Sequence, residues 1–199
     1  RRNNFSINGK GIYFHGCDYN TLQDNDFYYN KAGAILLLSS SDNNLCLDNR
    51  MNRSGIGWGQ NGGITVSASH HNLLINNTIE NSRGGIYLSN SVNDTLRDNT
   101  LLDNYYNFGV YGYSNIDTYL HDIDTTNTID GRPIYYWKNK HDQQYPVDSG
   151  YIALINSSNI EITDYDLSNN FQSILVAHSD HISIQDSSIE SNKDSGIDV

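Results

Sequence analysis

The sequence has little positive charge and no long apolar segment. Its 199 residues include 12 Lys and Arg against 23 Asp and Glu, which gives a formal net charge of −11. Binding of phosphates needs clustered Lys and Arg, so we expect no nucleic-acid partner. The longest apolar run, Ala34 to Leu38, is far shorter than the roughly 18 residues that cross a bilayer. We therefore expect no membrane span in this chain.

Sulfur-containing residues are scarce as well. The chain has two cysteines, Cys17 and Cys46, and one methionine. The cysteines do not have the spacing of metal ligands, and we interpret them as buried structural thiols. The histidines are too scattered to form a metal site. The sequence thus predicts no required cofactor.

Uncharged polar residues are abundant instead. The chain contains 28 Asn, 16 Gly and 15 Tyr. These residue types are middling to poor helix formers, which argues against a helical bundle. Disorder is also disfavoured, because aromatic residues make up 11% of the chain and aliphatic residues are spread along its length.

The sequence repeats itself with a period of about 22 residues. One element of the repeat is similar in four places, at residues 20–27, 44–51, 72–79 and 94–101. A short apolar segment follows each, as at Ala34 to Leu37 and Gly85 to Leu88. The same unit returns after an interruption, at residues 160–167 and 182–189. A fixed period of this length is the signature of a solenoid, whose coils bury their apolar faces only against one another.

The apolar positions align into columns when the repeats are stacked. They form the columns Leu22/Cys46/Leu74/Leu96/Ile162/Ile184, Phe27/Met51/Ile79/Leu101/Leu167/Ile189, Ile12/Ile35/Ile64/Ile86/Phe108/Ile174/Ile197 and Phe14/Leu37/Val66/Leu88/Val110/Val176/Val199. Short strands with period 2 that turn every seven or eight residues pair in parallel with the next coil. We therefore predict an all-β fold, a single-stranded right-handed parallel β-helix of about seven or eight coils. It should form one domain over residues 1–199 within a longer protein, with loop excursions near 53–63 and 117–150.

Asparagine recurs at two further positions of the repeat. One column comprises Asn25, Asn49, Asn77 and Asn99; a second, near a turn, comprises Asn43, Asn93, Asn115 and Asn159, with His71 and His181 in the same place. Stacked amides can hydrogen-bond from coil to coil, and asparagine tolerates the left-handed backbone of tight bends. We assign most asparagines to the structure.

The recurrence Asn-x-Ile/Leu-x-x-Asn-x-Ile/Leu followed by Gly-Ile-x-Leu resembles the repeats of NosD-like proteins, also called carbohydrate-binding and sugar-hydrolase domains. Residues 127–137, 148–154 and 159–162 are similar to a longer element of archaeal and bacterial surface members of that group. The resemblance covers essentially the whole chain and implies a right-handed parallel β-helix. It says less about activity, because this architecture serves in binding modules, lyases, hydrolases, epimerases and inert spacers. Relatives are often linked to copper, although no His, Cys and Met cluster supports that here.

Aromatic residues gather where the period is broken, and departures from a period often mark the binding face of a solenoid. Trp58 and Trp137 lie in the two excursions, Tyr105 and Tyr106 lie on the same corner between them, and Tyr28 and Tyr29 lie near it. Exposed tyrosine and tryptophan rings suit stacking on sugars. The alternative is that these rings only cover the flank of the helix.

Acidic residues recur just before the first asparagine column, as at Asp24, Asp48 and Asp98. Such carboxylates cap turns, bind cations such as Ca²⁺ between coils, or act in catalysis. The densest reactive set is Arg97, Asp98, His121, Asp122 and Asp124. With an offset of 24 residues, Arg97 would stack under His121 and Asp98 under Asp122.

This stacking leaves three interpretations open. Paired Asp98 and Asp122 carboxylates suit a retaining glycosidase, and the same pair could hold calcium. Arg97 beside His121 suits a lyase or epimerase acting on a uronate. The third interpretation is that all five are ordinary surface residues.

The leading hypothesis is a secreted or cell-surface module that binds, and in one version hydrolyses or cleaves, a polysaccharide of a cell envelope or matrix. Its partners would be that glycan and the neighbouring domains of a longer protein. The rival is a non-catalytic spacer of a surface layer, favoured by the even distribution of Asn and Ser. A metal-loading accessory protein is the least favoured hypothesis.

Overall fold

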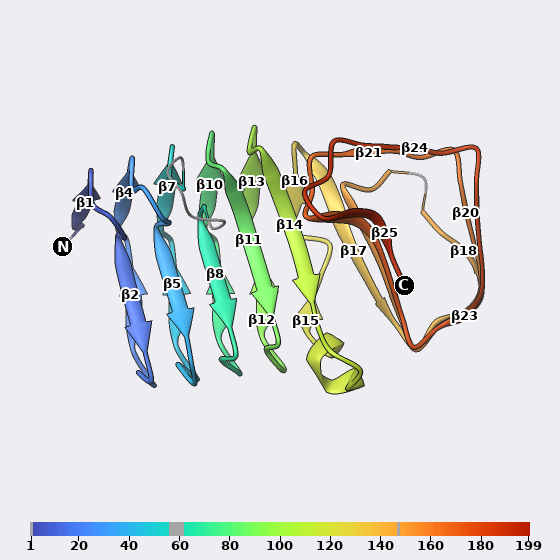
Figure 1. Cartoon of the computed structure of the whole chain (residues 1–199), viewed down its shortest axis with the longest axis horizontal. Coiled ribbons are helices and arrows are strands. Elements are labelled where there is room, and N and C mark those ends of the chain that lie inside the picture. The colour runs from blue at the N-terminus through green and yellow to red at the C-terminus, as the bar shows by residue number, and fades with distance from the viewer. Residues whose placement is uncertain (1, 56–61, 147) are drawn as a thin grey trace.

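The protein was analysed as a computed structural model that describes residues 2–55, 62–146 and 148–199. Short strands wind into a row of coils, visible from blue to yellow-green in Figure 1, which we call the first stack. The strands of each face pair in parallel with the equivalent strands of the neighbouring coils. The predicted all-β parallel β-helix is confirmed.

Three faces enclose the first stack. Face A contains β1 (Asn4–Ser6), β4 (Asp26–Tyr28), β7 (Arg50–Asn52), β10 (Thr78–Glu80), β13 (Thr100–Leu102) and β16 (Thr128–Ile129). Face B contains β2 (Ile12–His15), β5 (Ile35–Leu38), β8 (Ile64–Ser67), β11 (Gly84–Ser89) and β14 (Tyr106–Tyr111). Face C contains β3 (Thr21–Gln23), β6 (Leu45–Leu47), β9 (Leu73–Ile75), β12 (Thr95–Arg97) and β15 (Asp122–Ile123). A 3-10 helix, η1 (Ile116–Tyr119), lies between β14 and β15.

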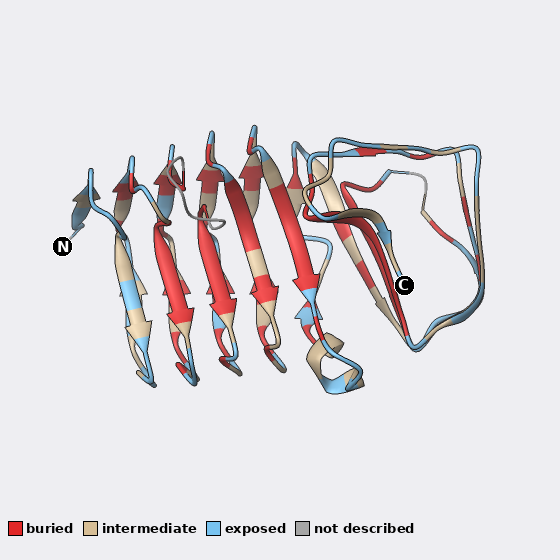
Figure 2. Cartoon of the chain, viewed as in Figure 1, coloured by how far each residue is buried: buried red, intermediate tan, exposed pale blue. Residues whose placement is uncertain are grey.

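The interior of the first stack is filled by the predicted apolar columns. In face C the register pairs Leu22 with Cys46, Cys46 with Leu74 and Leu74 with Leu96. In face B, Ile35, Ile64 and Ile86 pair in the same way. From the second coil onward these side chains are almost fully buried, as Figure 2 shows for β5, β8 and β11.

Buried asparagine ladders hold the turns together. The amides of Asn25, Asn49, Asn77 and Asn99 each donate Nδ2 to the Oδ1 of the next residue in the column, and Asn127 closes it, over 2.8–3.0 Å. The second predicted column has the left-handed backbone expected of it, with φ of 55° at Asn43 and 56° at His71. Asn115 departs from it, because its side chain caps η1.

Beyond β16 the chain reverses direction. Strand β17 (Arg132–Lys138) pairs antiparallel with β16 across a hairpin at Asp130 and Gly131, where glycine adopts φ 83°. A second stack then forms from β18 (His141–Gln144), β19 (Tyr151–Ile155), β20 (Ser158–Thr163), β21 (Asp166–Ser168), β22 (Gln172–Ala177), β23 (Asp180–Gln185), β24 (Ser188–Glu190) and β25 (Ser195–Asp198). Figure 1 shows its coils more nearly face-on than those of the first stack.

Two expectations from the sequence are corrected in this part of the chain. The interruption at 117–150 is mostly η1 and β15 to β18 rather than a loop. The later repeats do not continue the earlier columns: Leu167 and Ile189 pair in a two-stranded sheet of their own, and Ile162 and Ile184 pair in the sheet of β18, β20 and β23. A hairpin between two parallel runs breaks the alignment that a single uninterrupted solenoid would keep.

The sheet of β17, β19 and β22 separates two apolar cores. One side, with Tyr136 and Tyr151, packs against the first stack, and the other, with Ile152 and Leu154, packs inside the second. All residues of β19 and β22 are buried, as expected for parallel strands covered on both faces. Phe171 also joins the stacks, because its ring lies 4.5 Å from that of Tyr87 and 5.9 Å from that of Tyr106.

Candidate functional site

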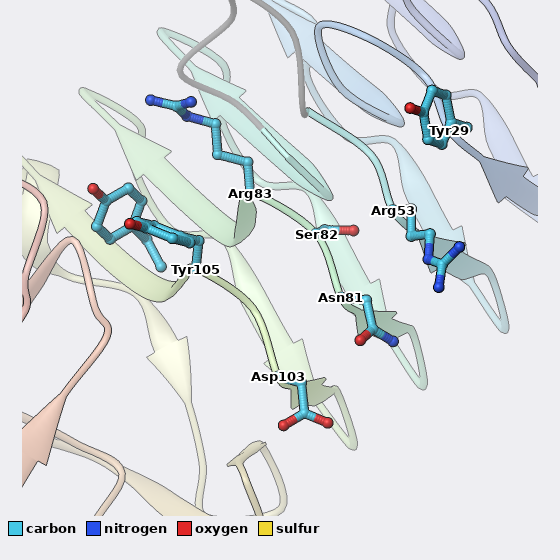
Figure 3. Close-up of a pocket in the computed structure, with 8 residues that line it drawn as sticks. Tyr29, Arg53, Asn81, Ser82, Arg83, Asp103 and Tyr105 are labelled. Carbon is cyan, nitrogen blue, oxygen red and sulfur yellow. The ribbon is translucent and has the colours of Figure 1, made fainter.

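A hollow of about 660 Å³ lies at the corner between faces A and B of the first stack. We call it the corner pocket, and it is shown in Figure 3. Its lining residues are Tyr29, Arg53, Asn81, Ser82, Arg83, Asp103, Tyr105 and Tyr106. Three of the six aromatic residues predicted to bind substrate therefore lie together.

One row of the pocket comes from the residue that follows each face A strand. Tyr29, Arg53, Asn81 and Asp103 occupy this position in four successive coils, with φ of 51–56°. The backbone N–H of Arg53 donates to the carbonyl oxygen of Glu80, and that of Asn81 donates to Leu102. Coils are spaced by roughly 4.8 Å, so the row extends for roughly 14 Å along the stack. A left-handed residue at the bend directs each side chain outward.

A second row begins two residues further along the chain. The N–H of Arg83 donates to the carbonyl oxygen of Ser54, and the N–H of Tyr105 donates to that of Ser82, so Arg83 and Tyr105 occupy equivalent places in successive coils. The Tyr105 side chain is 71% exposed, and its ring meets that of Tyr106 edge-on at 5.1 Å. Phe171 of the second stack supports Tyr106 from behind. One ring of this aromatic wall, that of Tyr106, is therefore packed against the second stack in the unliganded protein.

The remaining aromatic candidates lie elsewhere. Trp58 falls outside the described residues. Tyr28 is adjacent to Tyr29, at 6.0 Å between ring centroids, but it faces the surface of face A. Trp137 lies on β17 and packs against Tyr145 at 4.5 Å in the core of the second stack. The structure therefore gives Trp137 a packing role, the alternative considered for these rings.

The predicted reactive cluster is only partly assembled. Helix η1 and the residues on either side of it lengthen the connection before β15. Thr95 therefore pairs with Asp122, and the offset between paired residues of the two coils is 27 rather than 24. The predicted stacking of Arg97 under His121 and of Asp98 under Asp122 is therefore wrong. The backbone N–H of Asp98 instead donates to the Thr126 hydroxyl.

Arg97, Asp122 and Asp124 do come together on face C. The Arg97 guanidinium lies 2.5 Å from an Asp122 carboxylate oxygen and 3.0 Å from one of Asp124. A second Asp124 oxygen accepts hydrogen bonds from the backbone and hydroxyl of Thr126. These groups satisfy one another. Asp98 itself adopts φ 55°, as do Asp24 and Asp48, which places the acidic column at left-handed turns.

His121 is buried rather than exposed. Its side chain has no accessible surface, and its Nε2 lies 3.2 Å from the carbonyl oxygen of Thr118. Its Nδ1 accepts from the backbone N–H of Asp94 at 3.3 Å and lies 3.5 Å from the Asp94 carboxylate. Burial lowers the pKa of His121 to about 3 and raises that of Asp94 to about 7. This pair sits inside the stack, where no substrate reaches it.

Sequence reasoning missed Arg53, Asn81, Ser82, Arg83 and Asp103 as lining residues. Arg53, Asn81 and Asp103 share the bend position of Tyr29, Arg83 shares that of Tyr105, and Ser82 lies between the two, so aligning the residues after each face A strand would have found them. Arg53 and Arg83 lie outside the acidic column and the aromatic pairs that carried the prediction.

Residues 1–150 match the model of a protein family described as "Periplasmic copper-binding protein (NosD)". Searches among curated proteins and among solved structures found no match. In the part of the chain that the structure describes, no helix is long and apolar enough to cross a membrane.

The described residues do not form a copper-binding site of the kind that this description implies. No group of three or more His, Cys, Asp and Glu among the described residues could hold a metal ion. Met51 and Cys46 are buried in the core, and burial raises the pKa of the Cys46 thiol to about 12, so it stays protonated and cannot act as a thiolate ligand. We therefore derive no role from copper.

Proposed function

The chain belongs to the NosD family of β-helix proteins, and we propose that it is an extracellular module that binds a polysaccharide in the corner pocket. The family's description as periplasmic supports a site of action outside the cytoplasm. The observation that carries the proposal is the assembly of Tyr29, Tyr105 and Tyr106 in one hollow on a rigid scaffold.

The pocket has the chemistry that sugars need. Tyrosine rings offer flat apolar faces for the C–H surfaces of a pyranose, while their hydroxyls remain available to its polar edge. The exposed side chains of Asn81 and Asp103 add donors and acceptors beside them. Carbohydrate hydroxyls pair with such side chains.

The pocket is also extended and preorganised. Its two rows run along the stack axis, so a chain of several sugar units could lie across four coils. The bends beneath it are fixed by hydrogen bonds between coils, including the 3.0 Å bond from the Ser54 N–H to the Ser82 hydroxyl. A wall already in place costs less ordering entropy on binding.

We propose binding and not catalysis. The Arg97 guanidinium is already paired with two carboxylates, and His121 is buried. Catalysis by Asp98, Asp122 or Asp124 stays a prediction. It is tested by asking whether Asp122→Asn abolishes any release of reducing ends or unsaturated uronates.

The binding test compares Tyr105→Ala with Tyr19→Ala by affinity electrophoresis in gels containing a panel of envelope and matrix polysaccharides. Both tyrosines are highly exposed, at 71% and 79%, but Tyr19 does not line the pocket. We expect Tyr105→Ala to lose most of the retardation seen with the unaltered protein and Tyr19→Ala to keep it. If none of the three proteins is retarded by any polymer, the spacer hypothesis is favoured.

A further inference from the structure

We infer that the corner pocket selects a polysaccharide bearing carboxylate groups, that is, one containing uronic acid residues. This inference rests on the proposed function and adds the chemical class of the ligand. It is based on the two arginines that line the pocket, which have no carboxylate partner.

Arginines elsewhere in the described chain are neutralised. Four form ion pairs: Arg2 with Asp26, Arg50 with Glu80, Arg97 with Asp122 and Asp124, and Arg132 with Asp148. Arg53 and Arg83 have no carboxylate within ion-pair distance among the described residues, and both line the corner pocket. In a protein with a net charge of −11, two guanidinium groups thus lack a carboxylate partner at one place, and Arg53 makes only a long bond, of 3.5 Å, to the Tyr28 hydroxyl.

The pocket is locally positive. Among the described residues that line it, Asp103 is the only acidic one, against Arg53 and Arg83. The surrounding acidic surface repels polyanions at long range, so an anionic ligand is held by short-range contacts. A guanidinium matches a carboxylate through two parallel N–H···O bonds, which a neutral hydroxyl cannot reproduce.

The two guanidinium groups do not converge. Figure 3 shows Arg53 in the row of Asn81 and Asp103, with Arg83 directed to the other side of the pocket. One small anion could not reach both. A polymer with carboxylates on more than one unit could engage each arginine while its rings stack on Tyr105 and Tyr29. The geometry therefore favours a polyuronate over a single uronic acid or a free inorganic anion.

The decisive comparison is between a polyuronate and its methyl ester, which lacks the carboxylate charge. Retardation is measured in gels containing polygalacturonate, alginate or hyaluronate, and then with the methyl ester of whichever polymer binds. Dextran and dextran sulfate serve as the neutral and sulfated polymers. We expect at least tenfold weaker binding to the ester, and roughly tenfold weaker binding to the free acid for Arg53→Gln and for Arg83→Gln. Lys140→Gln removes the same charge from an exposed site outside the pocket and should change nothing.

The outcomes separate this inference from the proposed function. If Tyr105→Ala loses binding while both arginine variants and the ester bind normally, the pocket binds glycans but the inference is wrong. Equal binding of dextran sulfate and a polyuronate would also overturn it, because the ligand class would then be any polyanion. Unchanged thermal unfolding of the arginine variants confirms that they fold. Retention of none of the polymers would refute both proposals.

Discussion

Replacing Asp94 with asparagine should stabilise the protein, and the gain should increase with pH. Asp94 continues a ladder in which the side chains of Asn44, Asn72 and Asp94 each accept from the backbone N–H of the residue one coil earlier, which is Asn20, Asn44 and Asn72 in turn. Its Oδ1 does this for Asn72 at 2.9 Å, but its Oδ2 is buried without a hydrogen-bond partner. An amide in that place keeps the acceptor for Asn72 and carries no charge that burial would penalise.

The magnitude follows from the burial of the carboxyl group. Desolvation raises the pKa of Asp94 from 3.8 to about 7. A carboxyl group with a raised pKa binds its proton more tightly in the folded state, so the stability it contributes is lost as the pH rises from about 4 through 7. At 1.36 kcal/mol per unit the full loss is about 4 kcal/mol. The side chain of the Asp94→Asn variant does not titrate, so the variant does not lose this stability as the pH rises.

The lowered pKa of His121 makes stability depend on pH in the opposite direction. Burial lowers its pKa from 6.5 to about 3, so its share of the stability is present above about pH 6.5 and is lost as the pH falls toward 3. In the unaltered protein the two effects oppose each other between about pH 4 and 6.5. In the Asp94→Asn variant only the effect of His121 remains, so stability should increase with pH through that range.

Urea unfolding followed by circular dichroism at pH 5 and pH 8 measures both effects. The stabilisation by Asp94→Asn should be larger at pH 8 than at pH 5 by about 3 kcal/mol. Asp98→Asn makes the same change at an exposed turn and controls for the loss of one negative charge. A stabilisation of equal size at both pH values would refute the assignment of the raised pKa to Asp94.

Three further predictions concern the scaffold. Asn77→Ala removes acceptors for the backbone and side chain of Asn49 and a donor to the Cys46 carbonyl, all buried, and should cost at least about 3 kcal/mol in urea unfolding. Gly85→Ala places a methyl group 2.1 Å from the Asn107 carbonyl oxygen and should lower the melting temperature, whereas Gly9→Ala, with nothing within 4 Å, should not. Iodoacetamide at pH 8 should label the half-exposed Cys17 and spare Cys46 until denaturant is added; labelling of both in the native protein would contradict the burial of Cys46.

The first stack could be predicted from sequence because each coil repeats the same physical requirement. An inward aliphatic residue, a left-handed bend and a buried amide recur at fixed places, so Leu74 and Asn77 reveal their neighbours by alignment alone. The acidic column had an equally local cause, since Asp24, Asp48 and Asp98 sit at left-handed bends.

The second stack could not be predicted in this way. Its repeats look like those of the first, yet the hairpin at Gly131 reverses their direction, and nothing in Ile162 or Leu167 records which sheet they join. Likewise the extra residues around η1 shift the register of Asp122. A shift of three residues is invisible to an alignment in which Asp is common, and it separated Asp98 from its expected partner.

The same constraints explain why the candidate site lies at a corner. Inward positions are fixed by packing and ladder positions by buried hydrogen bonds, so neither can vary without cost. The left-handed bend after each face A strand fixes only the backbone, and its side chain is free to differ: Tyr29, Arg53, Asn81 and Asp103 are four different residue types in one column. A solenoid can therefore acquire specificity at such bends while its fold stays unchanged. We expect that specificity to come from the aromatic rings and from the arginines without a carboxylate partner in this column and the next.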